Sequence, residues 1–221
     1  MDANRPVAIA ITSLVFAALL FAATANATPI TFQVNVDTSS VSGTAGSLDF
    51  QFNPGPLAPV QAAFLDVASF SSDGTLTPPA SPIGDVSGTL PATITFDNGT
   101  GFNDYFEGFT FGSNLSFDVT IYGSGLGPPN KPGKSGSTFA FSMFSDAGGT
   151  TPALTTDTTD GFAVIIDVNV NGGTTVTDLS TETTVNLPAA PAPSQVPEPT
   201  TVLLVGVGLG AMWRRRRRIE Q

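Results

Sequence analysis

The side chains best suited to hold a cation in this sequence gather in one short stretch. Asp97, Asn98, Asn103, Asp104 and Glu107 fall within eleven residues. Carboxylate and amide oxygens are the ligands that Ca²⁺ prefers, and closely spaced oxygens on a turn can surround one ion. The spacing differs from the twelve-residue calcium loop, which alternates its ligands and ends in a glutamate. A calcium site and plain solvation of turn carboxylates are therefore both open interpretations of this stretch.

Aromatic side chains crowd the same stretch. Phe102, Tyr105 and Phe106 lie among the acidic and amide residues. A loop rich in aromatic rings can offer a surface on which a ligand such as a sugar ring stacks, but the same residues also fit a buried aromatic corner beneath the loop. The single tryptophan, Trp213, lies in an apolar run near the C-terminus, so the rest of the chain has few of the amphipathic rings that suit sugar binding.

The side chains that most often carry out catalysis are missing. The sequence contains no cysteine and no histidine, so it has no thiol nucleophile and lacks the usual general base and the usual zinc ligand. Glycosidases need two carboxyl groups on opposite sides of a bond. Asp66, Asp104 and Glu107 are available, but nothing in the sequence brings them together. We therefore expect no enzymatic activity and no resident cofactor.

The elements that position these residues are expected to be strands. Apolar and polar side chains alternate most clearly at 32–36, 48–52, 115–121 and 162–170. This alternation is typical of a strand with one buried face and one solvated face. Less regular strands are expected at 63–70, 93–96, 108–111, 138–144, 174–179 and 183–187. No helical period is evident between residues 28 and 187.

Turn signals separate these segments. Asn171-Gly172 lies between two strand patterns, which is the strongest short hairpin signal in the chain. The glycine-rich and proline-rich segment 123–136 predicts a long mobile surface loop. About ten short strands with frequent turns predict an all-β domain at 28–187, an antiparallel β-sandwich of jelly-roll-like or other Greek-key topology.

The exported part of the chain is predicted to be strongly acidic. Residues 28–195 contain fifteen acidic side chains and two basic ones, Lys131 and Lys134, which gives a formal charge of about −13. Such a surface repels phosphate backbones, so nucleic-acid binding is not expected. The absence of cysteine also means that no disulfide stabilises the fold.

The N-terminus has the parts of a secretory signal peptide. Arg5 precedes an apolar run at 7–21, and Ala25-Asn26-Ala27 provides a small-x-small cleavage site. We predict that residues 1–27 are removed and that the mature chain begins at Thr28. A retained N-terminal helix is the alternative.

The C-terminus combines three parts. The tripeptide Pro197-Glu198-Pro199 precedes an uncharged apolar run at 200–213, and five arginines follow the run: Arg214, Arg215, Arg216, Arg217 and Arg218. Basic residues after an apolar run predict a membrane segment with a cytoplasmic anchor. Fourteen helical residues reach only about 21 Å, less than the ~30 Å hydrocarbon core, which suits temporary retention. The proline-rich and alanine-rich segment 188–195 predicts a semi-rigid stalk.

This C-terminal arrangement, residues 196–221, resembles the PEP-CTERM sorting signal of Gram-negative bacterial envelopes. The resemblance implies that an exosortase, a membrane cysteine transpeptidase, recognises the tail and cuts near the tripeptide. The segments 36–40 and 103–109 also look like parts of the uncharacterised exported domains that accompany such tails. An ordinary single-span anchor with a proline-rich stalk is the alternative.

Taken together, the sequence predicts an exported, non-enzymatic protein of the cell surface or extracellular matrix. Its C-terminal helix would hold it in the inner membrane until exosortase processing. The alternative is a binding module, recognising exopolysaccharide or adhering through calcium. Binding of a glycan or stabilisation by Ca²⁺ distinguishes the binding module from the structural component.

Overall fold

The computed structural model describes residues 27–127 and 133–187. The predicted stalk at 188–195, the C-terminal segment at 196–221 and all but the last residue of the predicted signal peptide lie outside the described residues. Within the described ranges, no helix is long and apolar enough to span a membrane.

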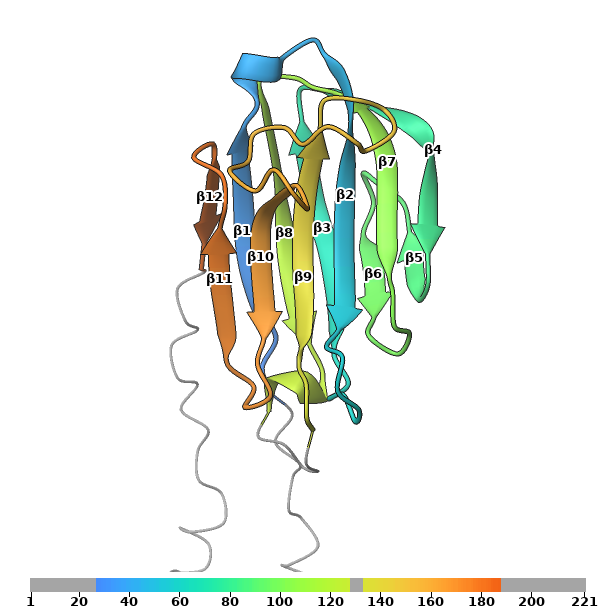
Figure 1. Ribbon diagram of the computed structural model, residues 1–221, viewed down its shortest axis with the longest axis vertical. Coiled ribbons are helices and arrows are strands. Elements are labelled where there is room, and N and C mark those ends of the chain that lie inside the picture. The colour runs from blue at the N-terminus through green and yellow to red at the C-terminus, as the bar shows by residue number, and fades with distance from the viewer. Residues whose placement is uncertain (1–26, 128–132, 188–221) are drawn as a thin grey trace, which may run out of the picture. The chain divides into compact units, whose positions relative to one another are not determined.

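The described residues form two six-stranded antiparallel sheets, which lie one in front of the other in Figure 1. Sheet A has the order β12 (Thr183–Asn186), β1 (Ile30–Asp37), β8 (Asn114–Tyr122), β3 (Phe64–Ser72), β6 (Ile94–Asp97), β5 (Val86–Gly88). Sheet B has the order β11 (Thr174–Asp178), β10 (Phe162–Val168), β9 (Ser137–Phe144), β2 (Ala45–Pro54), β7 (Asp104–Thr110), β4 (Thr75–Ile83). Two short 3₁₀ helices, η2 (Ser39–Val41) and η3 (Ser124–Leu126), lie in connections. The prediction of an all-β antiparallel fold is confirmed.

Strand pairing is nested along the chain. β1 pairs with β8, β2 with β7, and β3 with β6. The partners of the first three strands therefore follow in reverse order along the chain. This nesting is typical of a jelly roll, in which two antiparallel ribbons fold together into two sheets. β9, β10 and β11 extend sheet B, and β12 extends sheet A beside β1. Several neighbouring strands, such as β1 and β12, are therefore far apart in sequence.

The core lies between the sheets and is rich in phenylalanine. Phe50 of β2 packs edge to face against Phe117 of β8, with ring centroids 5.2 Å apart, which joins sheet B to sheet A. Phe141 of β9 completes the group at 4.8 Å from Phe117. All three side chains are buried, and Phe50 and Phe117 come from segments with clear alternation. The apolar face of each strand is thus the inner face of its sheet.

The sequence pattern did not predict two of the strands, β4 and β5. β4 contains Pro78, Pro79 and Pro82, which cannot donate a backbone hydrogen bond and so argue against a central strand. β4 lies at an edge of sheet B, where a missing donor on the outer side is tolerated. β5 has only three residues, which is too short for a readable alternation.

β7 begins earlier than the sequence indicates. The expected strand started at residue 108, with 97–107 as loop, but β7 extends from Asp104 to Thr110. Its period of two is complete, because Tyr105, Glu107 and Phe109 are buried while the residues between them are half-buried. Residues 104–107 of the supposed binding loop therefore belong to a strand with two distinct faces.

The predicted hairpin at Asn171-Gly172 is confirmed. It joins β10 to β11, and the Asn169 N–H donates to the Gly173 carbonyl at 2.8 Å. Gly172 has a φ of 82°, in the left-handed region that glycine adopts without strain. In the expected loop at 123–136, η3 is anchored where the Gly125 N–H donates to the Ala62 carbonyl at 2.7 Å, whereas residues 128–132 lie outside the described residues.

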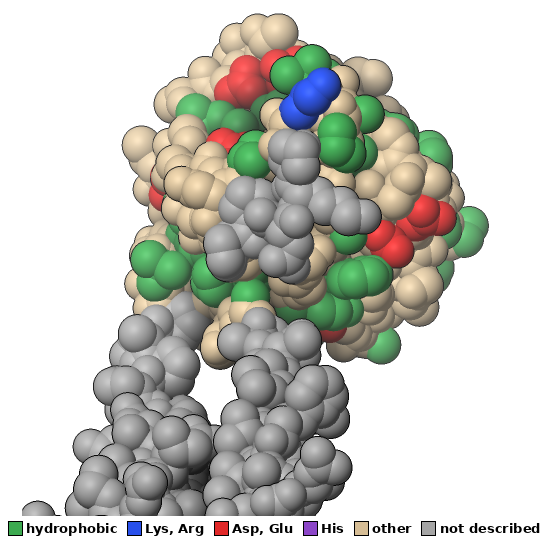
Figure 2. Space-filling model, turned by 90° about the horizontal axis from the view of Figure 1, so that it is seen from below, with side chains coloured by type: hydrophobic (Ala, Val, Ile, Leu, Met, Phe, Trp, Pro, Cys, Tyr) green, Lys and Arg blue, Asp and Glu red, His purple; other side chains and the backbone are tan. Residues whose placement is uncertain are grey.

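The chain enters and leaves the domain at one end. β1 starts and β12 finishes there, since Gln33 pairs with Asn186 in antiparallel register. Figure 2 views this end and shows hydrophobic side chains spread among polar ones. Five large hydrophobic side chains are exposed in the described part of the chain, and four of them belong to segments at this end: Leu57, Ile83, Phe102 and Leu187. The opposite end carries neither chain connection.

Replacing Phe50 tests the contact between the sheets. We expect Phe50→Ala to lower the free energy of unfolding by about 3–5 kcal/mol, because it leaves a cavity among buried rings. Phe102→Ala removes the same ring from a site that is 48% exposed and should change stability by less than about 0.5 kcal/mol. Urea unfolding of the full chain in detergent, followed by far-ultraviolet circular dichroism, measures both. Equal losses in the two variants would contradict this account of the core.

Candidate functional site

Asn103, one of the predicted calcium ligands, is buried just before β7 and holds the connection from β6 in place. Its Oδ1 accepts hydrogen bonds from the Asp85 N–H at 2.8 Å and from the Thr100 hydroxyl. Its Nδ2 donates to the Phe52 carbonyl at 3.0 Å. Its backbone N–H donates to the Asn53 Oδ1 at 2.6 Å. The amide oxygen is therefore already occupied by protein donors.

Asn98 plays a similar part at the end of β6. Its Oδ1 accepts from the Ala63 N–H at 2.9 Å, and its Nδ2 donates to the Gln61 carbonyl and the Ser137 hydroxyl, each at 2.8 Å. The side chain is only 6% exposed. It ties the start of β3 to the start of β9, which is a structural role that the sequence did not indicate.

The three carboxylates of the same stretch point to different places. Asp97 accepts from the Gly99 N–H at 3.0 Å in the turn after β6. Asp104 lies on the outer face of sheet B, and Glu107 is 2% exposed on the inner side of β7. Among the described residues, no group of three or more acidic side chains is placed to hold a metal ion. The structure thus does not bring the five expected calcium ligands into one site.

Glu107 belongs to a buried hydrogen-bond network instead. The Tyr105 hydroxyl donates to the Glu107 Oε2 at 2.5 Å, and it accepts from the Leu90 N–H at 2.9 Å. The Thr89 hydroxyl lies 3.0 Å from the Tyr105 hydroxyl oxygen. Burial and the hydrogen bond to Glu107 raise the pKa of Tyr105, so the phenol keeps its proton. The network joins β7 to the segment after β5.

The three rings expected to stack on a ligand do not form one surface. Phe102 is 48% exposed in the connection before β7, while Tyr105 is fully buried. Phe106 is half-buried on the outer face, because adjacent residues of a strand point to opposite sides. The burial of Tyr105 agrees with the interpretation as a buried aromatic corner. Of the three rings, only that of Phe102 is exposed.

The acids considered for glycosidase chemistry are also separated. Asp66 lies on the outer face of sheet A, where its Oδ1 accepts from the Thr95 hydroxyl at 2.8 Å. Asp104 lies on the outer face of sheet B, and Glu107 lies inside the domain. Three carboxyl groups on three different faces cannot flank one bond.

An aromatic pair that sequence reasoning missed lies on sheet A. Phe64 of β3 and Tyr122 of β8 stack on the outer face, with ring centroids 5.5 Å apart and planes 18° from parallel. Both rings are half-buried, and the Tyr122 hydroxyl donates to the Asp66 Oδ1 at 3.3 Å. Burial and the charge of Asp66 raise the pKa of Tyr122. Only the pairing of β3 with β8 reveals this contact, since the two residues are distant in sequence.

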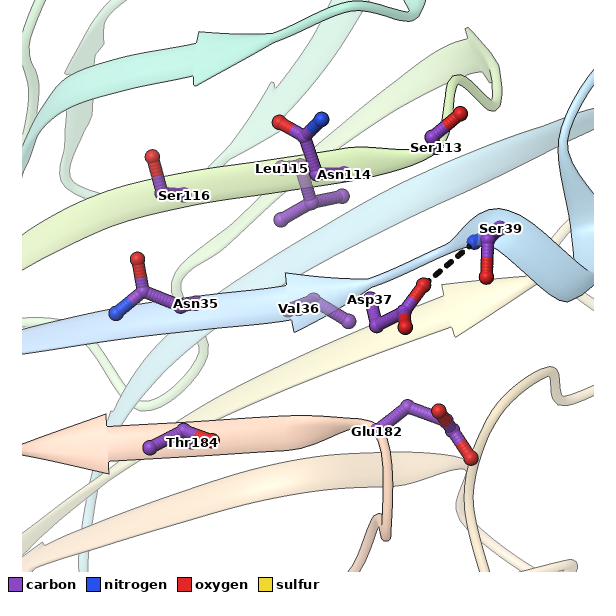
Figure 3. Close-up of a pocket in the computed structure, with 10 residues that line it drawn as sticks. All are labelled: Asn35, Val36, Asp37, Ser39, Ser113, Asn114, Leu115, Ser116, Glu182 and Thr184. Carbon is purple, nitrogen blue, oxygen red and sulfur yellow. Dashed lines mark hydrogen bonds between the residues drawn. The ribbon is translucent and has the colours of Figure 1, made fainter.

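The other end of the same face is hollowed. An open hollow of about 530 Å³ lies where β1 ends and β8 and β12 begin. Figure 3 shows its lining, in which the charged side chains are Asp37 and Glu182 and most others carry hydroxyl or amide groups. The side chain and backbone of Ser39 hydrogen bond to Asp37 and hold the pKa of that carboxyl below its usual range. The hollow therefore offers hydrogen-bond acceptors and negative charge.

Comparison with protein-family models matches the C-terminus of the chain. Residues 195–218 match the PEP-CTERM protein-sorting motif. The chain carries a PEP-CTERM sorting signal. The match covers the tripeptide, the apolar run and the arginines of the sequence analysis, and it confirms the resemblance stated there. It supports exosortase-dependent sorting of an exported protein that is anchored in the membrane before processing.

The domain that precedes the PEP-CTERM signal finds no counterpart in the other two comparisons. No curated protein and no solved structure matches the chain. The matched residues themselves lie outside the described part of the structure.

Asn103 provides a test of the site. We expect Asn103→Asp to lower the free energy of unfolding by about 2–4 kcal/mol, because it removes two donors and leaves a buried carboxylate. Asp97→Asn, which alters a predicted ligand with one turn contact, should cost less than about 1 kcal/mol. Urea unfolding with and without Ca²⁺ measures both. Calcium stabilisation of the native chain that disappears in Asp97→Asn would instead restore the calcium interpretation.

Proposed function

We propose that this chain is an exported β-sandwich cargo without enzymatic activity, which an exosortase processes at the C-terminal signal. The product belongs to the cell surface or to the extracellular matrix. The observation that carries this proposal is the PEP-CTERM motif at 195–218, which follows a folded domain that ends its last strand at Asn186.

The domain's geometry supports the proposal. Both chain connections leave from one end, so the domain needs only one attachment, and its exposed hydrophobic side chains gather mainly at that end. Exposed apolar side chains that lie together can mark a surface that contacts a membrane or another protein. The hollowed, polar end is the one that carries no connection.

The side-chain chemistry supports a non-enzymatic role. The sequence has neither histidine nor cysteine, and the amide and phenol groups of the stretch at 98–107 hydrogen bond to the protein itself. Groups already satisfied by structural partners have little capacity left for proton transfer or ligand binding. These residues are better explained as fold-determining than as catalytic.

The processing step is tested by the mass of the mature C-terminus. Protein recovered from the producing cell should lack residues 200–221, and replacing Pro197, Glu198 and Pro199 with alanine should leave those residues attached. The matched control replaces Pro191 and Pro193 of the preceding segment with alanine and should be processed normally. An intact tail on the native protein, or equal processing of both variants, would refute exosortase cleavage at this motif.

A second candidate function is binding of a neutral polysaccharide on the outer face of sheet A. It is favoured by the half-exposed stack of Phe64 and Tyr122 and by the polar rows of β1 and β8 beside it. Sugar rings pack their apolar faces on aromatic rings, and their hydroxyls bond to amide and carboxylate groups. The face replaces the stretch at 102–106 as the place where such binding would occur.

Tyr122→Ala tests this candidate. Binding of the full chain to the neutral polysaccharide fraction of the producing cell's envelope should weaken at least about tenfold, as expected when a stacking ring is lost. Phe102→Ala, the matched removal of an exposed ring elsewhere, should bind as the native chain does. Absence of binding by the native chain would leave the structural role as the proposed function.

A further inference from the structure

Two acidic side chains on the outer face of sheet B lie close together without a basic partner. In the pairing of β2 with β7, Asp49 lies opposite Phe106 and Gln51 lies opposite Asp104. Asp49 and Asp104 are therefore diagonal neighbours on one face, within reach of each other's side chains. Their carboxyl groups are close enough to hydrogen bond once one of them carries a proton.

The two carboxyl groups are only partly satisfied. Asp49 is 8% exposed, and its Oδ2 accepts from the Gln51 Nε2 at 2.9 Å. Among the described residues, nothing donates a hydrogen bond to the buried Oδ1 of Asp49 or to that of Asp104. Burying an ionised carboxylate oxygen without a donor or a counter-charge is strongly unfavourable.

No neighbouring element supplies a positive charge within the described chain. β9 places Ser142 beside Asp49, and β4 places Ser81 and Ile83 beside β7. Lys134 is the one basic residue in these ranges, and it precedes β9 at the end of the domain where that strand begins. The other titratable groups on the flanking elements are all acidic: Asp146, Asp157 and Asp160 on the β9–β10 connection, Asp167 on β10.

We infer that Asp49 and Asp104 share one proton across β2 and β7, and that the folded domain's need to keep this proton makes it less stable as the pH rises from acidic to neutral. In the shared state the protonated Asp49 carboxyl donates to Asp104. This hydrogen bond involves the Oδ1 atoms of both residues, which otherwise lack a partner among the described residues. Only one negative charge then stays on the face. Loss of the proton leaves two like charges in a largely dry environment.

The surroundings of Asp49 favour its protonated form, as this geometry requires. Burial raises the pKa of Asp49 to about 8, with further contributions from the hydrogen bond and the charge of Asp104, while the Gln51 bond opposes the change. An unfolded aspartate has a pKa near 3.8. Between these values the folded chain binds a proton that the unfolded chain releases, so stability falls as the pH rises from about 4 to about 8.

The acid pair lies beside the β9–β10 connection, which crosses sheet B. Phe106 lies opposite Asp49, and its ring packs against Gly149 of the β9–β10 connection. A Cβ at position 149 would lie only 2.7 Å from the Phe106 ring. Figure 1 shows this connection crossing the upper part of sheet B. The Ser47 hydroxyl donates to the Asp146 carbonyl at 2.9 Å and links the same connection to β2. Repulsion within the pair therefore acts next to the contacts that hold the connection down.

Asp49→Asn is the decisive variant. An asparagine can accept from Gln51 and donate to Asp104, so it imitates the protonated pair at every pH. Urea unfolding of the full chain in detergent, from pH 5 to pH 8.5, should give similar stability for both forms at pH 5. The native chain should then lose stability as the pH rises, by up to about tenfold in the unfolding constant per pH unit, relative to Asp49→Asn.

Ser142→Ala is the matched control, because it alters a neutral side chain beside Asp49 and should keep the native pH dependence. In case Asp49→Asn fails to fold, ¹³C shifts of the native aspartate carboxyl groups give a direct reading, with one titration near pH 8 expected. The inference is overturned if the native chain and Asp49→Asn share one pH profile, or if every aspartate titrates below pH 5. It is equally overturned if Ca²⁺ or Mg²⁺ stabilises the native chain at pH 8.5 but not Asp49→Asn, since the pair would then hold a metal ion.

Discussion

The edge-to-face contact between Phe50 and Phe117 is the interaction on which the rest of the domain depends. It joins one of the two central strands of sheet B to one of the two central strands of sheet A, and Phe141 packs against both rings. Once these positions point inward, the period of two sends every neighbouring residue outward. The polar side chains of β2 and β8 that alternate with these rings must therefore lie on the outer faces of the sheets. The outer surfaces of both sheets, with the acid pair on one and the aromatic stack on the other, follow from this one inward contact.

β7 shows how strictly this constraint divides a short sequence. Asp104 and Phe106 lie on the outer face of sheet B, while Tyr105 and Glu107 point into the domain. A stretch that resembles a compact ligand site in one dimension is split by the strand into two unrelated environments. On the inner side the carboxylate receives the tyrosine hydroxyl. On the outer side the carboxylate meets another carboxylate, which changes its chemistry from cation binding to proton sharing.

The alternating segments could be predicted from the sequence because their signal is local. β1, β2, β8 and β10 were placed within a few residues, and so was the hairpin at Asn171-Gly172. β4 was missed because its prolines contradict a strand unless its edge position is known. The acid pair and the Phe64–Tyr122 stack were missed for a different reason, since each depends on the register between strands distant in sequence. The sorting motif could be read directly because its parts are contiguous and need no fold to bring them together.

The nested topology also bears on why a cargo of this kind benefits from a C-terminal signal. β1 pairs with β8 and β12, so sheet A cannot close until nearly the whole domain has been exported. Pairings so distant in sequence form slowly, and unpaired strand edges are prone to aggregation in the meantime. No disulfide holds the partly folded chain, because the sequence has no cysteine. In the proposed function, a tail that stays in the membrane until it is cut keeps each chain separate while β12 finds β1. Cleavage beyond β12 then releases a domain whose last strand is already in place.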